Sequence, residues 1–244
     1  MGNNYSSWEF VLKYVDYTKW RVIALDLLGF GDAPKPAKAA YSPRDHAQAV
    51  MNTLDKLGVK KATFAGHSMG CIVAIDIGAH WANRVESLVL LGAPLYKNAP
   101  KSSPLRKFTK AEGMYFSIFE IVQKNPDAVQ AGGTIADELV PFVKGMEITE
   151  EVWPAYRKSL EHTIMQQKSY KQAQKLAIPT LFVNGLFDLF IIAKNTKLVR
   201  KHNKNVRIKN VLGPHELTPS QGKTVAEIIN QQMPARAKRK TASA

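Results

Sequence analysis

Short runs of β-branched and other apolar residues alternate with longer segments of helical periodicity along most of the chain. Such alternation is typical of a parallel sheet whose strands are joined by crossover helices. The strand candidates are RVIALD (21–26), KATFAG (61–66), ESLVLLGA (86–93), PTLFVNG (179–185) and NVRIKNV (205–211). The pattern therefore predicts an α/β fold with a mostly parallel sheet and flanking helices.

Start and stop signals mark the helix expected between the first two strands. Ser42 is placed to cap its N-terminus, with Pro43 at the first helical position. Asp45 completes a capping box with Ser42, and Gly58 follows the last turn. A further helix, CIVAIDIGAHW (71–81), is expected after the next strand, and its small residues allow close packing on the sheet.

The alternation breaks in the middle of the chain. There the sequence carries a Lys- and Pro-rich linker, an aromatic patch MYFSIF (114–119) and a helical candidate at 150–167. We predict that residues 96–175 form a helical insert, or cap, and that residues 1–95 and 176–244 form one core. A chain of 244 residues, 45% of them hydrophobic, is long enough for such a core.

Charge and cysteine content narrow the choice of partners and cofactors. The net charge of +14 is scattered, and its densest cluster lies in residues 234–244, which we interpret as a disordered basic tail. We expect no specific nucleic-acid partner, although binding through this charge stays an alternative. The single Cys71 excludes an internal disulfide and a Cys–Cys zinc site, and its neighbours predict a core position.

Hydropathy indicates no membrane span. No apolar run approaches the roughly 18 residues needed to cross a bilayer, and the N-terminus lacks a secretory pattern. We therefore expect a cytoplasmic location. The oligomeric state is left open.

The segment Gly66-His67-Ser68-Met69-Gly70 fits the nucleophile-elbow pattern G-x-S-x-G and stands between a predicted strand and a predicted helix. In such a turn, side chains at the flanking positions would collide with neighbouring backbone, so we expect both glycines to be needed. The same strain lifts the serine hydroxyl clear of the sheet. Ser68 is therefore the candidate nucleophile, and an ordinary serine in a tight turn is the alternative.

Two later segments supply a base and an acid. Asp188 follows the end of the strand PTLFVNG, and His215 follows the last predicted strand in the loop GPH. Sites of open parallel sheets form at the carboxyl ends of strands. The chain order Ser68, Asp188, His215 is the order expected for a triad on this architecture.

These segments together resemble the α/β-hydrolase superfamily, in the group with a helical cap. DLLGFGDAPKP (26–36), GHSMG, VLLGAPLY (89–96), GLFD and GPH stand in family order. The resemblance implies that Ser68 is the nucleophile, that His215 is the general base and then acid, and that Asp188 orients the imidazole. It also implies the backbone N–H of Met69 as one oxyanion donor.

The chain departs from the family at the segment that should supply the second oxyanion donor. The resemblance places it in a loop opened by His-Gly, with a Trp some residues later, and Trp8 matches that residue. Met1 would then be the first residue after His-Gly and a candidate second donor. A strand expected between RVIALD and KATFAG is also missing. We therefore predict an N-terminally truncated chain, produced by a misassigned start codon.

The expected function is hydrolysis of a small, apolar carboxylic ester, thioester or lactone through an acyl-enzyme on Ser68. His67, Met114, Phe116 and Phe119 are candidate substrate-lining residues. The chemistry needs no metal and no organic cofactor. The serine disfavours dehalogenase and epoxide hydrolase activity, which use an aspartate in this superfamily. C–C bond hydrolysis, perhydrolysis, aminopeptidase activity, a non-catalytic ligand-binding role and an inactive truncated fragment stay open.

Overall fold

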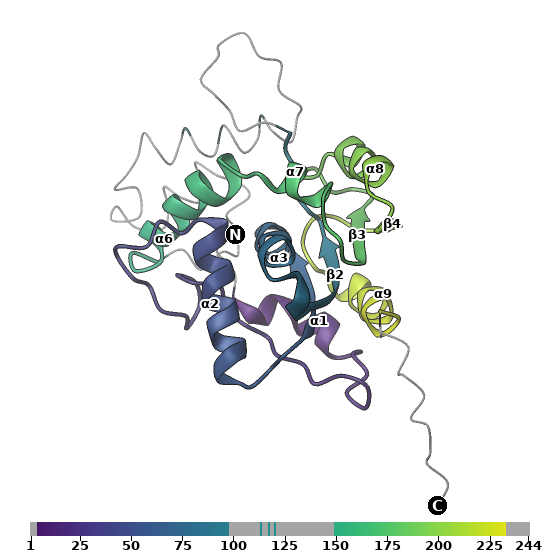
Figure 1. Ribbon diagram of the computed structural model, residues 1–244, viewed down its shortest axis with the longest axis horizontal. Coiled ribbons are helices and arrows are strands. Elements are labelled where there is room, and N and C mark those ends of the chain that lie inside the picture. Colours follow the sequence, from purple (N-terminus) through teal and green to yellow (C-terminus); the bar gives the residue numbers. More distant parts are fainter. Residues whose placement is uncertain (1–3, 98–112, 114–116, 118–119, 121–148, 233–244) are drawn as a thin grey trace, which may run out of the picture.

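A four-stranded parallel sheet forms the centre of the protein (Figure 1). The computed structural model describes residues 4–97, 113, 117, 120 and 149–232. The strands follow one another in space as they do in sequence: β1 (Ala62–His67), β2 (Val85–Leu91), β3 (Thr180–Gly185) and β4 (Val206–Val211). Four of the five strand candidates are thus strands, and the predicted α/β fold is confirmed.

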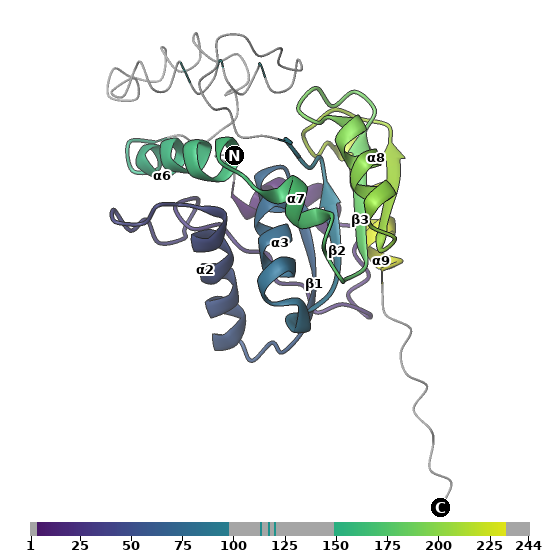
Figure 2. The ribbon, with the colours of Figure 1, turned by 45° about the horizontal axis from the view of Figure 1, so that its top comes forward.

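Helices cover both faces of this sheet (Figure 2). Alternate residues of β2 point to opposite faces, since Leu88 and Leu90 belong to one core cluster and Val89 and Leu91 to another. The first cluster includes residues of α2 (Pro43–Lys56), α3 (Met69–His80), α7 (Ser169–Ala173) and α8 (Ala193–His202). The second includes residues of α1 (Glu9–Leu12) and α9 (Pro219–Asn230). Short 3-10 turns lie at Tyr5–Trp8 and Ala82–Arg84.

The start of α2 is built as the sequence predicts. The Ser42 hydroxyl accepts a hydrogen bond from the Asp45 N–H at 3.2 Å, and the Asp45 carboxylate accepts one from the Ser42 N–H at 3.1 Å. Gly58 has a φ of +67°, a left-handed value that glycine adopts without strain. The capping box and the terminating glycine are therefore both present.

Part of the expected insert lies beside α2 and α3 (Figure 2). Here α6 (Trp153–Lys158) continues directly into a π-helix (Ser159–Met165). Both pack on a third apolar cluster that includes Phe30 and Ile72. Residues 98–112 and 121–148 lie outside the described residues, as does the tail at 234–244, so the division into core and cap stays a prediction.

The prediction of a strand at residues 21–26 was wrong. The segment is not assigned as a strand, and its backbone makes no backbone hydrogen bond to another described residue. Apolar alternation alone does not make a strand, because a strand also needs a paired neighbour. β1 occupies an edge of the described sheet, and its one described strand partner is β2.

His46 lies in the fully buried contact between α2 and the π-helix. Its Nε2 is 3.2 Å from the Ser159 hydroxyl, and burial lowers the pKa of His46 to about 4 from 6.5. The unfolded chain therefore binds a proton here at a higher pH than the folded chain does. The contribution of His46 to the free energy of unfolding is fully present above pH 6.5, and it is lost as the pH falls toward 4.

We expect the free energy of unfolding to fall by roughly 1 kcal/mol per pH unit between about pH 6 and 4 on account of His46. His46→Gln keeps an amide near Ser159 but cannot titrate. The unfolding free energy of this variant should therefore fall less steeply with pH, by that amount. Urea denaturation at several pH values measures this. His202→Gln, at an exposed position of α8, is the control, and equal slopes for the wild-type and His46→Gln chains would contradict the account.

Candidate active site

The turn between β1 and α3 holds Ser68 in a strained conformation. Its φ of +52° and ψ of −120° lie in a region that non-glycine residues rarely adopt, at a cost of about 1–3 kcal/mol. A Cβ atom at Gly66 would lie 2.6 Å from the Gly70 carbonyl oxygen, so Gly66 must be a glycine. At Gly70 a Cβ would meet no described atom within 4 Å. The expectation that both glycines are sterically required was therefore wrong for Gly70, because its Cα faces open space.

Backbone hydrogen bonds beyond the strand ends fix the loops that carry the candidate residues. The Ser68 N–H donates to the Leu91 carbonyl at 2.9 Å, next to the end of β2. After β3, the Leu186 N–H donates to the Val211 carbonyl at 2.9 Å. The loops after β3 and β4 are joined once more by the Phe187 N–H, which donates to the Gly213 carbonyl at 3.1 Å. The loops therefore keep a fixed spacing at the carboxyl edge.

Ser68, His215 and Asp188 meet at this edge. The Ser68 Oγ lies 2.8 Å from His215 Nε2, and His215 Nδ1 lies 2.8 Å from Asp188 Oδ2. The other carboxylate oxygen of Asp188 accepts the Phe190 N–H at 2.8 Å. The side chain of Asp188 is 1% exposed and that of His215 is 9% exposed, so water screens this pair weakly. The structure thus brings together the three residues that the sequence singled out.

Gly92, just past β2, was not identified as a site residue from the sequence. A Cβ at this position would lie 3.0 Å from Asp188 Oδ2 and 3.1 Å from His215 Nδ1, and its φ is +58°. Gly92 therefore leaves the space in which the imidazole meets the carboxylate. The segment VLLGAPLY, which contains it, was noted only for its resemblance to the family.

His67 supports the loop of His215 rather than bonding to Ser68 directly. Its Nε2 lies 2.6 Å from the His215 carbonyl oxygen. Burial, followed by the charge of His215, lowers the pKa of His67 to about 3, which keeps its imidazole neutral at pH 7. Because a carbonyl can only accept, Nε2 carries the proton and donates it.

The structure describes only some of the remaining candidate residues. Met69 is the first residue of α3 and is buried, so its N–H belongs to the first turn, where backbone donors have no intrahelical partner. Met1, Met114, Phe116 and Phe119 lie outside the described residues. Cys71 is buried as predicted, and burial raises its pKa well above the usual value.

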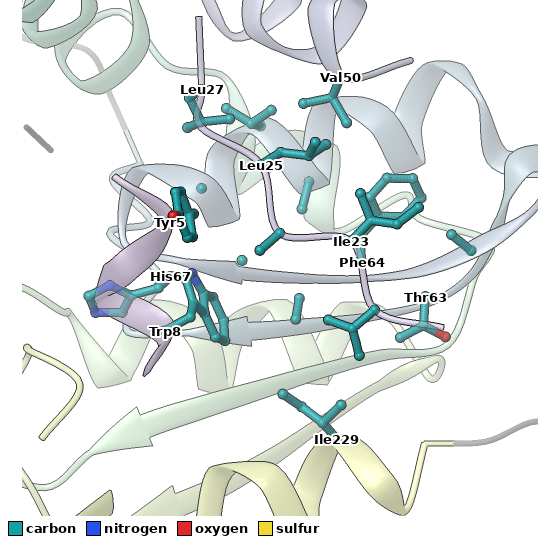
Figure 3. A pocket seen from close by; sticks show the side chains of 18 of the residues that line it. Tyr5, Trp8, Ile23, Leu25, Leu27, Val50, Thr63, Phe64, His67 and Ile229 are labelled. Carbon is teal, nitrogen blue, oxygen red and sulfur yellow. The ribbon is translucent and has the colours of Figure 1, made fainter. Parts of the chain in front are cut away.

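A cavity of about 810 Å³ opens beside Ser68 (Figure 3). It runs from Tyr5, Trp8 and His67 along β1 toward Thr63. Leu27, Phe30 and Ser68 also line the cavity. Within the described residues, no helix is long and apolar enough to cross a membrane.

A comparison with known protein families identifies the family to which this fold belongs. The model of the alpha/beta hydrolase fold family matches residues 1–213 of the chain. The match spans well over half of the chain, and the protein therefore belongs to this family. The resemblance seen in the sequence is confirmed at this level.

Two curated proteins illustrate the range of relatives. The probable lysophospholipase BODYGUARD 4 of Arabidopsis thaliana is 30% identical over 111 residues, which cover 45% of this chain and 27% of the relative. Bifunctional epoxide hydrolase 2 of Mus musculus is 27% identical over 101 residues, which cover 41% of this chain and 18% of the relative. The chain thus matches less than a third of the length of either protein.

Solved structures extend the similarity of the fold over nearly the whole chain. A thermophilic esterase from Thermogutta terrifontis has a TM-score of 0.71 at 19% identity and covers 93% of this chain and 84% of its own. A bromoperoxidase from Bacillus anthracis has a TM-score of 0.68 at 20% identity and covers 94% and 87%. At these identities the similarity shows the fold.

The two glycines of the elbow provide a matched test of this geometry. We expect Gly66→Ala to lower the free energy of unfolding by about 1–3 kcal/mol, because the new methyl group overlaps the Gly70 carbonyl. Gly70→Ala should change it by less than about 1 kcal/mol, since the position is open and alanine favours helix. Chemical denaturation measures both, and equal losses for the two variants would contradict the model of the turn.

Proposed function

We propose that the protein is a serine hydrolase that cleaves a small carboxylic ester, thioester or lactone with an apolar acyl group. The observation that carries this proposal is the pair of 2.8 Å contacts that links Ser68 through His215 to Asp188. Membership of the alpha/beta hydrolase fold family supports hydrolysis as the reaction class.

In the acylation step, the Ser68 Oγ attacks the substrate carbonyl carbon while His215 Nε2 accepts the hydroxyl proton. Asp188, bound to Nδ1, holds the imidazole in the tautomer that leaves Nε2 free to accept, and it stabilises the imidazolium that forms. The tetrahedral intermediate then collapses. His215 returns the proton to the leaving oxygen or sulfur, and the acyl group stays on Ser68.

In the deacylation step, water takes the place of the leaving group. His215 Nε2 accepts a proton from the water as its oxygen attacks the acyl carbon. The second tetrahedral intermediate releases the carboxylic acid, and the proton returns to the Ser68 oxygen. The two steps balance with water as the only further reactant.

The negative oxygen of each intermediate needs hydrogen-bond donors. The Met69 N–H is suited to this role, because it opens α3, where backbone N–H groups lack intrahelical partners and the helix dipole favours negative charge. One such donor is typically worth about 10²–10³ in rate. The proposed second donor at Met1 lies outside the described residues.

The surroundings of Ser68 support an apolar acyl group. Leu27, Phe30 and Met69 line the cavity together with Ser68. The Arabidopsis relatives that are named as probable lysophospholipases support an ester as the substrate class. A serine at the elbow favours this chemistry over that of the epoxide hydrolases among the relatives, since epoxide hydrolases of this superfamily use an aspartate.

A fluorophosphonate probe tests the proposal, because it phosphonylates activated serines. We expect one adduct by intact mass on the wild-type chain and none on Ser68→Ala. Ser220→Ala, at an exposed serine, should be labelled like the wild type. Among p-nitrophenyl esters, a hexanoate should be turned over faster than an acetate.

Two results would contradict the proposal. The first is an adduct that persists in Ser68→Ala, since the reactive serine would then be another one. The second is a folded chain that gives neither an adduct nor ester turnover. Circular dichroism of each variant separates this second result from misfolding.

A further inference from the structure

The four most exposed large hydrophobic residues of the described chain lie in the loops after β3 and β4. Their exposed fractions are between 61% and 70%, and none of them lines the cavity beside Ser68. They are Leu186, Phe187 and Leu189 after β3 and Leu212 after β4. Apolar side chains scattered singly over a surface are common, but an exposed apolar cluster of this kind marks a surface that binds something.

Backbone hydrogen bonds hold the two loops of this exposed apolar cluster against each other. The N–H groups of Leu186 and Phe187 donate to the carbonyls of the residues on either side of Leu212, at 2.9 and 3.1 Å. Asp188 lies between the exposed side chains of Phe187 and Leu189, and its own side chain is 1% exposed. The loop that turns Asp188 inward therefore turns its apolar neighbours outward.

The stretch between Leu189 and Leu212 is strongly basic. It contains seven Lys and Arg residues and no Asp or Glu, and all seven side chains are exposed. None of the seven forms an ion pair with another described residue. Their seven positive charges equal half of the net charge of +14. The residues of this basic stretch are Lys194, Lys197, Arg200, Lys201, Lys204, Arg207 and Lys209.

The basic stretch runs along α8 and β4, which lie side by side at one edge of the described sheet (Figure 1). On α8, Asn195 and Val199 are buried, so Lys197 and Lys201 belong to the face that points away from the sheet. Glu216, the next acidic residue along the chain, lines the cavity instead. Exposed positive charge therefore extends from the exposed apolar cluster along both elements.

Neither helix stability nor protection of the sheet edge explains both features. Lys194 lies in the first turn of α8, where the helix dipole disfavours a cation. Charged residues such as Arg207 and Lys209 keep an edge strand from pairing with other chains, but this protection needs no exposed leucine. The two features also meet, since Lys194 comes five residues after Leu189 and Lys209 three residues before Leu212. One partner that binds both apolar and positive groups accounts for them together.

We propose that the exposed apolar cluster and the basic stretch dock on an anionic phospholipid surface. The negative potential of such a surface attracts exposed Lys and Arg, and its interface accepts apolar side chains between the headgroups. A nucleic acid would match the positive charges alone and leave Phe187 and the leucines in water. A second copy of the chain is disfavoured, because a symmetric contact would bring two basic stretches together.

Docking in this orientation brings the candidate active site to the lipid surface. Asp188 belongs to one of the docking loops, and the Phe190 ring in the same loop lies 4.7 Å from the ring of His215. The inference goes beyond the proposed hydrolase function and does not rest on it, because docking uses no atom of Ser68. Ser68→Ala should bind vesicles like the wild type, so the two proposals can fail separately.

Cosedimentation with lipid vesicles tests the positive charges. Vesicles of phosphatidylcholine and phosphatidylserine at about two to one should bind the wild-type chain at least about tenfold more tightly than vesicles of phosphatidylcholine alone. Lys194→Glu combined with Lys209→Glu should weaken binding to the charged vesicles at least about tenfold. Lys56→Glu combined with Lys60→Glu is the matched control, since it reverses two exposed charges near the end of α2. It should weaken binding by less than about threefold.

Two exposed leucines test the apolar contribution. Leu212→Ser should weaken binding to the charged vesicles at least about fivefold, because its side chain leaves water when the loop docks. Leu57→Ser, at an exposed leucine that follows α2, should bind like the wild type. Circular dichroism checks that every variant is folded.

Four results would overturn the proposal. The first is a folded wild-type chain that does not bind the charged vesicles. The second is equal binding by the two double variants, which would assign vesicle binding to other basic residues, such as those of 234–244. The third is a Leu212→Ser chain that binds vesicles like the wild type, together with tight, salt-sensitive binding of double-stranded DNA that the lysine substitutions on α8 and β4 weaken, which would assign the surface to a nucleic acid. The fourth is a dimer in light scattering that Leu212→Ser dissociates, which would assign the exposed apolar cluster to a second copy.

Discussion

Parallel hydrogen bonding between neighbouring strands brings the carboxyl ends of β1, β2, β3 and β4 to one edge of the sheet. The three candidate residues come from loops after β1, β3 and β4, and Ser68 and His215 are 147 positions apart in sequence. Because pairing continues past the strand ends, as between Leu186 and Val211, these loops inherit the spacing of the sheet. The two 2.8 Å contacts are therefore a consequence of strand register.

The same constraint explains where strain is stored. Ser68 follows the last residue of β1 and precedes the first of α3, so the chain must reverse direction within one residue. The Ser68 N–H stays bonded to Leu91, which holds the turn against the sheet while the side chain points to His215. Two glycines, Gly66 and Gly92, leave the room that this arrangement needs.

Much of this could be predicted from the chain itself, because local patterns determine it. Short apolar runs predicted five strands, of which four are present, cap residues predicted α2, and the order of Ser68, Asp188 and His215 predicted their meeting. What failed depends on neighbours that are distant in sequence. Residues 21–26 have the apolar content of a strand but no paired partner, and Gly70 looked necessary although its surroundings are open. Gly92 and the bond from His67 to the His215 carbonyl become visible only once the strands are placed.

The central claim is that Ser68, His215 and Asp188 act as one unit. Its most direct test is the second-order rate of fluorophosphonate labelling of Ser68 in the Asp188→Asn chain, compared with the wild type at pH 7.5. If Asp188 fixes the tautomer of His215, the rate should fall by about 10³–10⁴ while the variant stays folded. A folded Asp188→Asn chain that is labelled within a few-fold of the wild-type rate would contradict the account.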